Sequence, residues 1–422
     1  MKFFFLRRIA KSKHWFRETY KSFACWIVVA SAIGAVVGLI DAALNYGLEM
    51  CFKLRTACPY LIFALPLCGL ATVGVYHLLG IRSDKGTNLV ITSVRDGDEM
   101  NWRNTVSIFA GTLLTHFGGG SAGREGAALQ IGGSVGSQIG IWLGMDVQSH
   151  RLITMCGMSA GFAALFGTPV AAALFSMEVI SVGIMHYSAL VPCVISSLVG
   201  FAVSSRLGVA KMSPVIVAGE ADWALYVKVV VIALLCGLLA MVFCYVLRES
   251  GKLYSRYIKN PYLKAVVGSL LVIGLTFIVG TYDYNGGGSE VIARAFVTPA
   301  SGFGFALKLL FTAVTLGAGF KGGEILPVFY VGATFGSFMG PLFGLDCSFG
   351  AALGLTCLFC GVTNCPVAAL LIAIELFGAK YLPVFLLAVA VSYMLSGYVG
   401  LYSEQKILYS KIEPKYIDTK VG

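Results

Sequence analysis

Long hydrophobic stretches separated by short polar segments dominate this 422-residue chain. The eight longest stretches run approximately over residues 23–48, 58–79, 105–144, 152–207, 223–247, 262–280, 303–343 and 347–400. A membrane-spanning helix needs about 20 apolar residues, so several stretches are too long for one helix. Glycine-rich breaks divide them into pieces too short for uniform full spans. The pattern predicts an all-α polytopic membrane protein with about ten or more hydrophobic passages, some of them tilted or re-entrant.

The composition excludes a water-soluble chain of this length, because 57% of the residues are hydrophobic and only 12% are charged. The 51 glycines suggest two uses. Glycine allows close packing of membrane helices, and it allows the backbone to leave helical geometry beside a ligand. We therefore expect helices that are interrupted at functional positions.

The net charge of +10 reflects membrane topology rather than a nucleic-acid partner. The first 21 residues contain seven basic residues against one acid, and further lysines and arginines lie in the segment 248–264 and after residue 404. Cytoplasmic segments of membrane proteins carry such an excess. The distribution predicts a multi-pass protein of the cell membrane, with residues 1–21 as a basic cytoplasmic segment and with both termini in the cytoplasm.

The sequence offers little support for an enzyme or a metal site. Most of the 12 cysteines lie in apolar stretches, and the Cys357/Cys360 pair has no second pair or histidine cluster. The glycine-rich segment 118–126 lacks the Lys-Ser/Thr ending of a phosphate-binding loop. We expect no catalytic activity, no metal and no cofactor. A passive structural or receptor protein leaves the duplicated breaks and their acids unexplained.

The chain contains an internal duplication with an offset of about 200 residues. Three segments recur in order: 87–91 as 288–292, 118–126 as 317–324, and 169–178 as 366–375. Broken helices at matching positions of two halves indicate a transporter site near the middle of the bilayer. Helix N-termini there present free amide protons and the positive end of the helix dipole, which suits a small anion.

Two acidic residues lie at the matching breaks. Glu125, in Gly-Arg-Glu-Gly, is costly at membrane depth when ionised. When charged it can compete with an anion for the same amides, and when neutral it can carry a proton; the alternative is an ion pair with Arg124 that only fixes a turn. Glu324 can form a proton path together with Glu125, or a salt bridge with Lys321. These residues are the candidates for proton coupling.

Other polar residues near helix ends have simpler interpretations. Glu178 and Glu375 each lie at the end of a repeated segment and are expected to act as capping or interface residues. Tyrosines near membrane boundaries are commonly interfacial anchors, and we expect this role for Tyr402. Position alone gives Tyr409 no stronger assignment.

Four motifs resemble the signature elements of the CLC anion channels and transporters, in the order found in that family. They are Gly-Arg-Glu-Gly at 123–126, Leu-Phe-Gly-Thr-Pro at 165–169, Gly-Gly-Glu-Ile-Leu-Pro at 322–327 and Leu-Tyr-Ser at 408–410. The resemblance spans nearly the whole chain. It implies the CLC fold, with a first inverted repeat over 22–207, a second over 208–400, and a C-terminal pore helix and cytoplasmic tail over 401–422. It also implies a homodimer with one pore per subunit, without the paired regulatory CBS domains of some relatives.

The resemblance also assigns roles to individual positions. It makes Glu125 the gating glutamate and Tyr409 the central tyrosine, and it places the central serine hydroxyl at Thr87, although Asn88 is an alternative for facing the ion. The implied anion-binding positions at the two helix ends are Arg124, Gly126, Ile325 and Leu326, together with the amide of Glu324.

Three departures from the chloride-transporting members narrow the resemblance. Their Gly-Ser-Gly-Ile-Pro is Gly-Thr-Asn-Leu-Val at 86–90, their Gly-Ile-Phe-x-Pro is Gly-Glu-Ile-Leu-Pro at 323–327, and their inward-facing glutamate is Val179. Together these departures resemble the CLC-F branch of fluoride/proton antiporters. Loss of the inner glutamate alone suits a chloride channel equally well, and a chloride/proton antiporter is a further alternative. We expect proton flow on Glu125, with help from Glu324, to drive fluoride out of the cell.

Overall fold

The computed structural model describes residues 2–81, 85–217, 219 and 222–422, with side chains from residue 23 onward. The first half contains α1 (Lys2–Ala57), η1 (Pro59–Ala64), α2 (Leu65–Leu78), α3 (Thr87–Asp96), α4 (Trp102–Phe117), α5 (Glu125–Trp142), α6 (Val147–Phe166), α7 (Pro169–Glu178), β1 (Ser181–Val182), η2 (Tyr187–Ala189) and α8 (Leu190–Arg206). The second half contains α9 (Trp223–Tyr257), α10 (Pro261–Val279), α11 (Ser289–Ala295), α12 (Gly304–Gly317), α13 (Ile325–Leu342), α14 (Cys347–Thr363), α15 (Pro366–Phe377), η3 (Ala379–Tyr381), α16 (Leu382–Leu395), β2 (Lys406–Tyr409) and β3 (Tyr416–Lys420).

The expected all-α membrane fold, with full spans and shorter apolar pieces, is confirmed. In the described residues, six helices are long and apolar enough to cross a membrane, and five shorter apolar helices have 10–17 residues. This agrees with the expected ten or more hydrophobic passages, not all of them full spans. The shorter helices are the pieces into which the longest hydrophobic stretches are divided.

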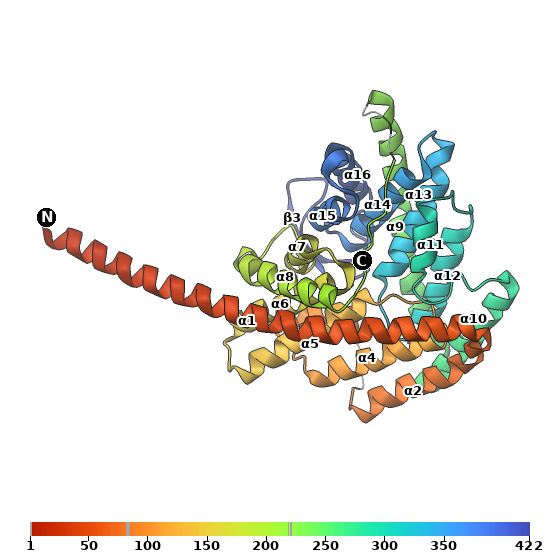
Figure 1. Ribbon diagram of the computed structural model, residues 1–422, viewed down its shortest axis with the longest axis horizontal. Helices are drawn as coiled ribbons and strands as arrows, with labels where there is room; N and C mark the ends of the chain where they lie inside the picture. Colours follow the sequence, from red (N-terminus) through yellow and green to blue (C-terminus); the bar gives the residue numbers. More distant parts are fainter. Residues whose placement is uncertain (1, 82–84, 218, 220–221) are drawn as a thin grey trace.

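The two halves place equivalent helices in equivalent environments. Helices α1–α8 lie largely on one side of the molecule and α9–α16 on the other, and α7 meets α15 where the halves join (Figure 1). Helix α2 likewise contacts its counterpart α10. The matching helices α6 and α14 even begin with matching caps, because the carboxylates of Asp146 and Asp346 accept hydrogen bonds from the first-turn amides. Hydrogen bonds from Ser149 lower the pKa of the Asp146 carboxyl.

Glycines allow the closest helix contacts in each half. A Cβ atom on Gly157 of α6 would lie 1.9 Å from the carbonyl oxygen of Gly132 in α5. In the second half, a Cβ atom on Gly354 of α14 would lie 2.1 Å from the carbonyl oxygen of Gly332 in α13. Only glycine fits at such distances. The expectation that the glycines serve close helix packing is confirmed for these two pairs.

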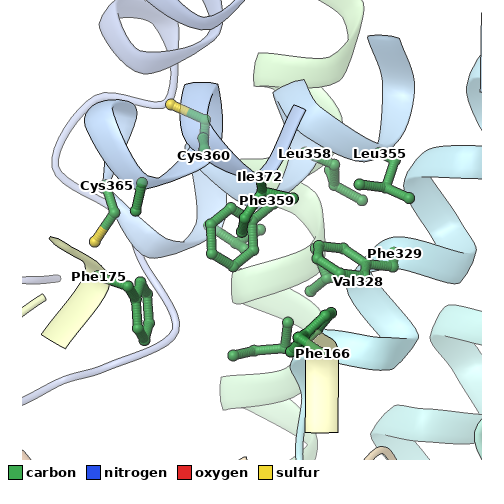
Figure 2. Packing of buried hydrophobic residues seen from close by; sticks show 14 of the residues in the cluster. Phe166, Phe175, Val328, Phe329, Leu355, Leu358, Phe359, Cys360, Cys365 and Ile372 are labelled. Atoms are coloured by element: carbon green, nitrogen blue, oxygen red, sulfur yellow. The ribbon is translucent and has the colours of Figure 1, made fainter. Parts of the chain in front are cut away.

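Aromatic side chains from both halves form the centre of the core. Phe166 at the end of α6 meets Phe329 of α13 with ring centroids 5.0 Å apart, and Phe359 of α14 lies 5.5 Å from Phe329 and 5.8 Å from Phe175 of α7. Figure 2 shows these rings converging from different helices. Aromatic pairs at such separations add to the stability gained by burial. The packing fixes the end of α6 against the start of α13.

The prediction of a C-terminal pore helix within 401–422 is wrong. Strand β2 pairs in parallel with β1 and antiparallel with β3, which gives a small three-stranded sheet. In β2, Ile407 is fully buried and Tyr409 is exposed, and a register shift in the pairing with β3 lies between them. Pro414 between the strands does not favour continuation of a helix.

Candidate functional site

The two halves are joined by a pair of hydrogen bonds between equivalent glycines. The amide of Gly123 donates to the carbonyl of Gly323 at 2.6 Å, and the amide of Gly323 donates to the carbonyl of Gly123 at 2.7 Å. A Cβ atom on Gly323 would lie 2.4 Å from the amide nitrogen of Gly126, so this approach requires glycine. Such reciprocal pairing is what a two-fold relation between the halves produces. It brings the N-termini of α5 and α13 together.

Glu125 is the first residue of α5 and is 1% exposed. Its carboxylate accepts a hydrogen bond from the Arg124 amide at 3.0 Å, and it also interacts with its own amide and with the amide of Leu326 in α13. The carboxylate thus occupies amide donors from both helix N-termini. An anion bound there would take the same donors, so Glu125 and an anion compete for one position.

Arg124 contacts both the carboxylate of Glu125 and helix α1. Its Nε atom lies 3.7 Å from a Glu125 carboxylate oxygen, and its guanidinium also donates to the side chain of Asn45 in α1. The ion pair considered for Glu125 is therefore present. It coexists with the amide contacts, so it does not reduce Glu125 to a residue that only fixes a turn.

Glu324 lies at the matching break of the second half, one position earlier relative to its helix than Glu125, and faces a different neighbourhood. It is the N-cap residue of α13, and one of its carboxylate oxygens lies 3.4 Å from the position that a Cβ atom on Gly126 would occupy. The Thr87 hydroxyl lies 3.3 Å from that same position. Gly126, Thr87 and Glu324 therefore converge. Ile325 and Leu326, which follow Glu324, are both buried.

Thr87 faces the site, and Asn88 does not. The Thr87 hydroxyl is within 3.4 Å of the side-chain amide of Gln130 in α5, whereas the Asn88 side chain accepts a hydrogen bond from the backbone of Glu404 at 3.1 Å. Gln130 was missed by the sequence reasoning. The available signal was the spacing of the polar residues in α5, at positions 130, 134 and 137, which places them on one helix face.

The tyrosine assignment must be corrected. Tyr409 is 48% exposed and packs against Tyr416 in the small sheet, away from the helix ends. Tyr402, expected to be an interfacial anchor, is instead 2% exposed, and it lies close enough to Glu324 and Glu125 to interact with their charges. Its hydroxyl has no hydrogen-bond partner within the part of the chain that the structure describes. The tripeptide Leu-Tyr-Ser occurs at 401–403 as well as at 408–410, and the first copy enters the site.

A set of polar contacts holds Tyr402 and Thr87 in place. Arg95 of α3 forms an ion pair with Glu404 at 3.4 Å, next to the contact between Asn88 and the Glu404 backbone. Lys85, just before α3, and Thr92, within α3, both donate hydrogen bonds to the carboxylate of Asp98. These hydrogen bonds lower the pKa of the Asp98 carboxyl. The segment after α16 is thereby anchored to the segment that carries Thr87.

Glu178 and Glu375 are capping residues, as expected from their positions. The Glu178 carboxylate accepts hydrogen bonds from the amides of Val367 and Ala368 at 3.0 and 2.9 Å, at the start of α15. The Glu375 carboxylate accepts from the amides of Val170 and Ala171 at 3.1 and 2.8 Å, at the start of α7. Each helix therefore carries, at or near its C-terminal end, the residue that caps its counterpart.

Buried Gln405 occupies the surroundings of Val179, the position of the missing inner glutamate. The Gln405 side-chain amide donates to the carbonyl oxygens of Val179 and Thr363 at 2.9 and 3.0 Å. Its oxygen accepts from Asn364 at 3.1 Å, and Asn364 accepts in turn from Lys411. Val179 thus takes part through its backbone carbonyl, which accepts from the side-chain amide of Gln405.

A cavity of about 390 Å³, here called the vestibule, opens beside Glu125. Its lining includes Arg55, His116, Glu125, Gly286 and Leu326. Glu324 is absent from that lining within the described residues. Glu125 therefore faces the vestibule, while Glu324 faces Thr87 on the other side of the paired glycines.

Comparison with known proteins supports this geometry. Residues 68–397 match the voltage gated chloride channel family. A chloride/fluoride channel protein from Pseudomonas syringae pv. tomato is 35% identical over 399 residues, which cover 92% of this chain and 88% of that protein. A solved CLC-type fluoride/proton antiporter has a TM-score of 0.88 and 31% identity, with coverage of 92% of this chain and 98% of that one. A slow cyanobacterial Cl⁻/H⁺ antiporter, with a TM-score of 0.76 and 19% identity over 88% of this chain and 94% of its own, shares the fold.

The family match covers more than half of the chain, and the fold brings two helix N-termini and two carboxyl groups to one pathway. The chain therefore belongs to the CLC family and is a membrane-embedded transporter of anions and protons.

Proposed function

We propose that this transporter is a fluoride/proton antiporter, which exports fluoride in exchange for protons through a pore within each subunit. The observation that carries the proposal is the position of Glu324 at the N-cap of α13, beside Gly126 and Thr87. Glu324 is a second carboxyl that can exchange a proton. Val179, at the position of the inward-facing glutamate of chloride-transporting members, cannot. The similarity to a chloride/fluoride channel protein and to a fluoride/proton antiporter adds support.

The donors around the site suit fluoride. Fluoride is smaller and more strongly hydrated than chloride, so close hydrogen-bond donors must replace its water shell. The buried hydroxyls of Thr87 and Tyr402 and the side-chain amide of Gln130 are such donors. A protonated Glu324 adds one more. Each of these groups is small enough to approach the ion closely.

The proposed exchange follows from the competition at the helix ends. Ionised Glu125 occupies the amides of α5 and α13 and excludes the anion. Protonation weakens its hold on those amides, so the neutral side chain leaves and an anion enters. Because Glu125 faces the vestibule and Glu324 faces Thr87, a proton that arrives on Glu125 passes to Glu324 as the anion moves the other way. Inward proton flow then drives fluoride out.

We further propose a bacterial plasma-membrane location with both termini in the cytoplasm, and a homodimer. The excess of basic residues in the first 21 positions supports the orientation. The resemblance to the CLC family supports the dimer. Light scattering of the purified protein in detergent tests the dimer, and a mass of one subunit contradicts it. Protease accessibility of a tag at each terminus in intact cells tests the orientation.

The deciding experiment measures both ions on one preparation. Liposomes that contain the purified protein are loaded with fluoride or with chloride, and an ion-selective electrode records release while an internal dye records pH. We expect fluoride release at least about tenfold faster than chloride release, with a pH change in step with it. Equal rates for the two anions overturn the fluoride assignment, and chloride flux insensitive to a pH gradient identifies a chloride channel.

A further inference from the structure

Three basic side chains gather at the wall of the vestibule, apart from the helix ends that bind Glu125. They are Arg55 in the last turn of α1, His116 in the last turn of α4 and Lys308 in α12. Arg55 and His116 line the vestibule. Lys308 lies directly beneath it, because its ammonium donates to the carbonyl of Gly286, which is itself a lining residue.

Lys308 is a fully buried basic side chain. It is 0% exposed, and its Nζ atom donates to the carbonyl oxygens of Tyr284 and Gly286 at 3.1 and 2.6 Å. The Nζ atom also lies 5.1 Å from the centroid of the Tyr330 ring. Carbonyls and a ring bring no negative charge. When Lys308 is protonated, these contacts therefore leave its positive charge uncompensated.

Arg55 approaches the same loop. One of its terminal nitrogens donates to the backbone carbonyl of His116 at 3.2 Å. The two terminal nitrogens lie 3.0 and 3.2 Å from the position of a Cβ atom on Gly286, whose φ is +61°. A side chain at residue 286 would fill the space in front of the guanidinium. Glycine keeps the Arg55 head group open to the vestibule.

Within the described residues, no ion pair joins Arg55 or Lys308 to a carboxylate. Arg55 and Lys308 lie close enough to act electrostatically on each other and on His116. The vestibule does contain acids, but Asp283 is paired with Arg294 at 2.8 Å and Glu49 accepts from Asn45 at 2.8 Å. Glu290 is exposed in the first turn of α11. Glu125 is held by Arg124 and the amides.

Lys308 is fully buried and Arg55 is partly buried, and a positive charge in such a place without an acid favours a bound counter-charge, because an unpaired buried charge is costly. The vestibule has room for one: its volume of about 390 Å³ exceeds that of a small hydrated anion. We propose that the vestibule binds a small inorganic monovalent anion against Arg55 and the Gly286 loop, with Lys308 supporting the charge from beneath. This site is additional to the position that Glu125 occupies.

This inference rests on the proposed function for its role. In the proposed exchange, protons reach Glu125 from the vestibule and fluoride leaves toward it, so the vestibule site holds the anion on the release side of Glu125. An exchanger runs in both directions, and an anion supplied from the vestibule side meets this site before it reaches Glu125. Loss of the site is therefore expected to weaken the apparent affinity for an anion supplied from the vestibule side more than the maximal rate.

The test compares three variants of the full-length protein: Arg55→Gln, Arg55→Lys and Lys53→Gln. Lys53 is exposed on the same helix end, so its variant removes an equal charge outside the vestibule. We expect Arg55→Gln to raise the half-saturating fluoride concentration of transport from the vestibule side about tenfold, with a maximal rate within about twofold of wild type. Arg55→Lys and Lys53→Gln should stay within about twofold of wild type. Calorimetric titration of the purified proteins with sodium fluoride should show the same order of affinities.

Two results overturn the site. One is an equal shift for Arg55→Gln and Lys53→Gln, which means that only the general surface potential is acting. The other is unchanged fluoride affinity in Arg55→Gln while the protein retains its thermal stability. If wild type transports chloride and not fluoride, the proposed function fails, and the same series read with sodium chloride still tests the vestibule.

Discussion

The starts of α5 and α13 are equivalent positions in the two halves, yet their acids are placed differently. Glu125 is the first residue of α5, and its carboxylate turns back onto the amides of Arg124 and Leu326. Glu324 comes one position earlier relative to its helix, as the N-cap of α13. Its carboxylate lies near Gly126 of the opposite helix and faces Thr87. A shift of one residue thus directs the two carboxyls to opposite sides of the paired glycines.

This difference teaches how a duplicated chain produces a directional pathway. Two identical halves related by a two-fold axis would present the same group to both mouths of the pore. Here Glu125 lines the vestibule and competes with the anion for amides, while Glu324 joins the hydroxyls of Thr87 and Tyr402. In the proposed exchange, Glu125 gates the site, and Glu324 helps to bind the ion and to release the proton.

The largest expected effect is the loss of proton movement when one of the two acids is replaced by glutamine. Glu125→Gln keeps the shape of the side chain but cannot exchange a proton, so we expect proton movement to fall at least about 100-fold. Glu324→Gln keeps a donor beside Thr87, and we expect a smaller fall, of about tenfold, with weaker preference for fluoride over chloride. The measurement is the internal pH of liposomes during fluoride release.

One result would contradict separate roles for Glu125 and Glu324. If the two variants lose proton movement equally and keep equal anion selectivity, the two carboxyls act in series as one proton path, without separate roles. Glu413→Gln is a suitable control, because Glu413 is exposed in the C-terminal segment and contacts neither acid.

A second pair of variants sharpens the boundary of the site. The Tyr402 hydroxyl is buried near both acids, whereas Tyr409 is half exposed on the small sheet. Tyr402→Phe removes one donor from the anion, so we expect a loss of about tenfold in apparent fluoride affinity. Tyr409→Phe should change it by less than about twofold. The electrode assay over a range of fluoride concentrations measures both, and a larger effect at Tyr409 would return the site to the second Leu-Tyr-Ser copy.

The tyrosine pair shows where sequence reasoning ends. The glycine-rich breaks, the two acids and the Glu178/Glu375 caps were predictable, because repetition in the chain marks them and their chemistry is local. Which of the two Leu-Tyr-Ser copies lies in the site was not predictable, because that depends on which tyrosine the folded chain buries. Residues 406–409 form a strand that pairs with β1, more than 220 positions earlier, as well as with the nearby β3. Such long-range pairing overrides a motif match.

Gln130 and Lys308 illustrate a second limit. Gln130 lies on the face of α5 that is turned toward Thr87. Helical periodicity identifies it once the position of Thr87 is known. Lys308 gives no such signal, since a lone lysine in an apolar helix does not reveal that the loop at 284–286 will fold over it. The vestibule is therefore a property of tertiary structure, while the helix ends are a property of the repeated sequence.

The smallest expected effect concerns the reciprocal caps, where the halves match in chemistry but differ in burial. Glu178 is 8% exposed, whereas Glu375 is more exposed and interacts with Lys211, a residue of the vestibule lining. Glu178→Ala removes a buried acceptor from the amides of Val367 and Ala368, which costs about 2 kcal/mol of unfolding free energy. Glu375→Ala removes a more exposed acceptor from the amides of Val170 and Ala171, where water replaces it more easily, so its cost is about 1 kcal/mol. Chemical unfolding in detergent measures both, and a larger loss for Glu375→Ala would mean that the burial of the acid does not set the cost of losing its cap.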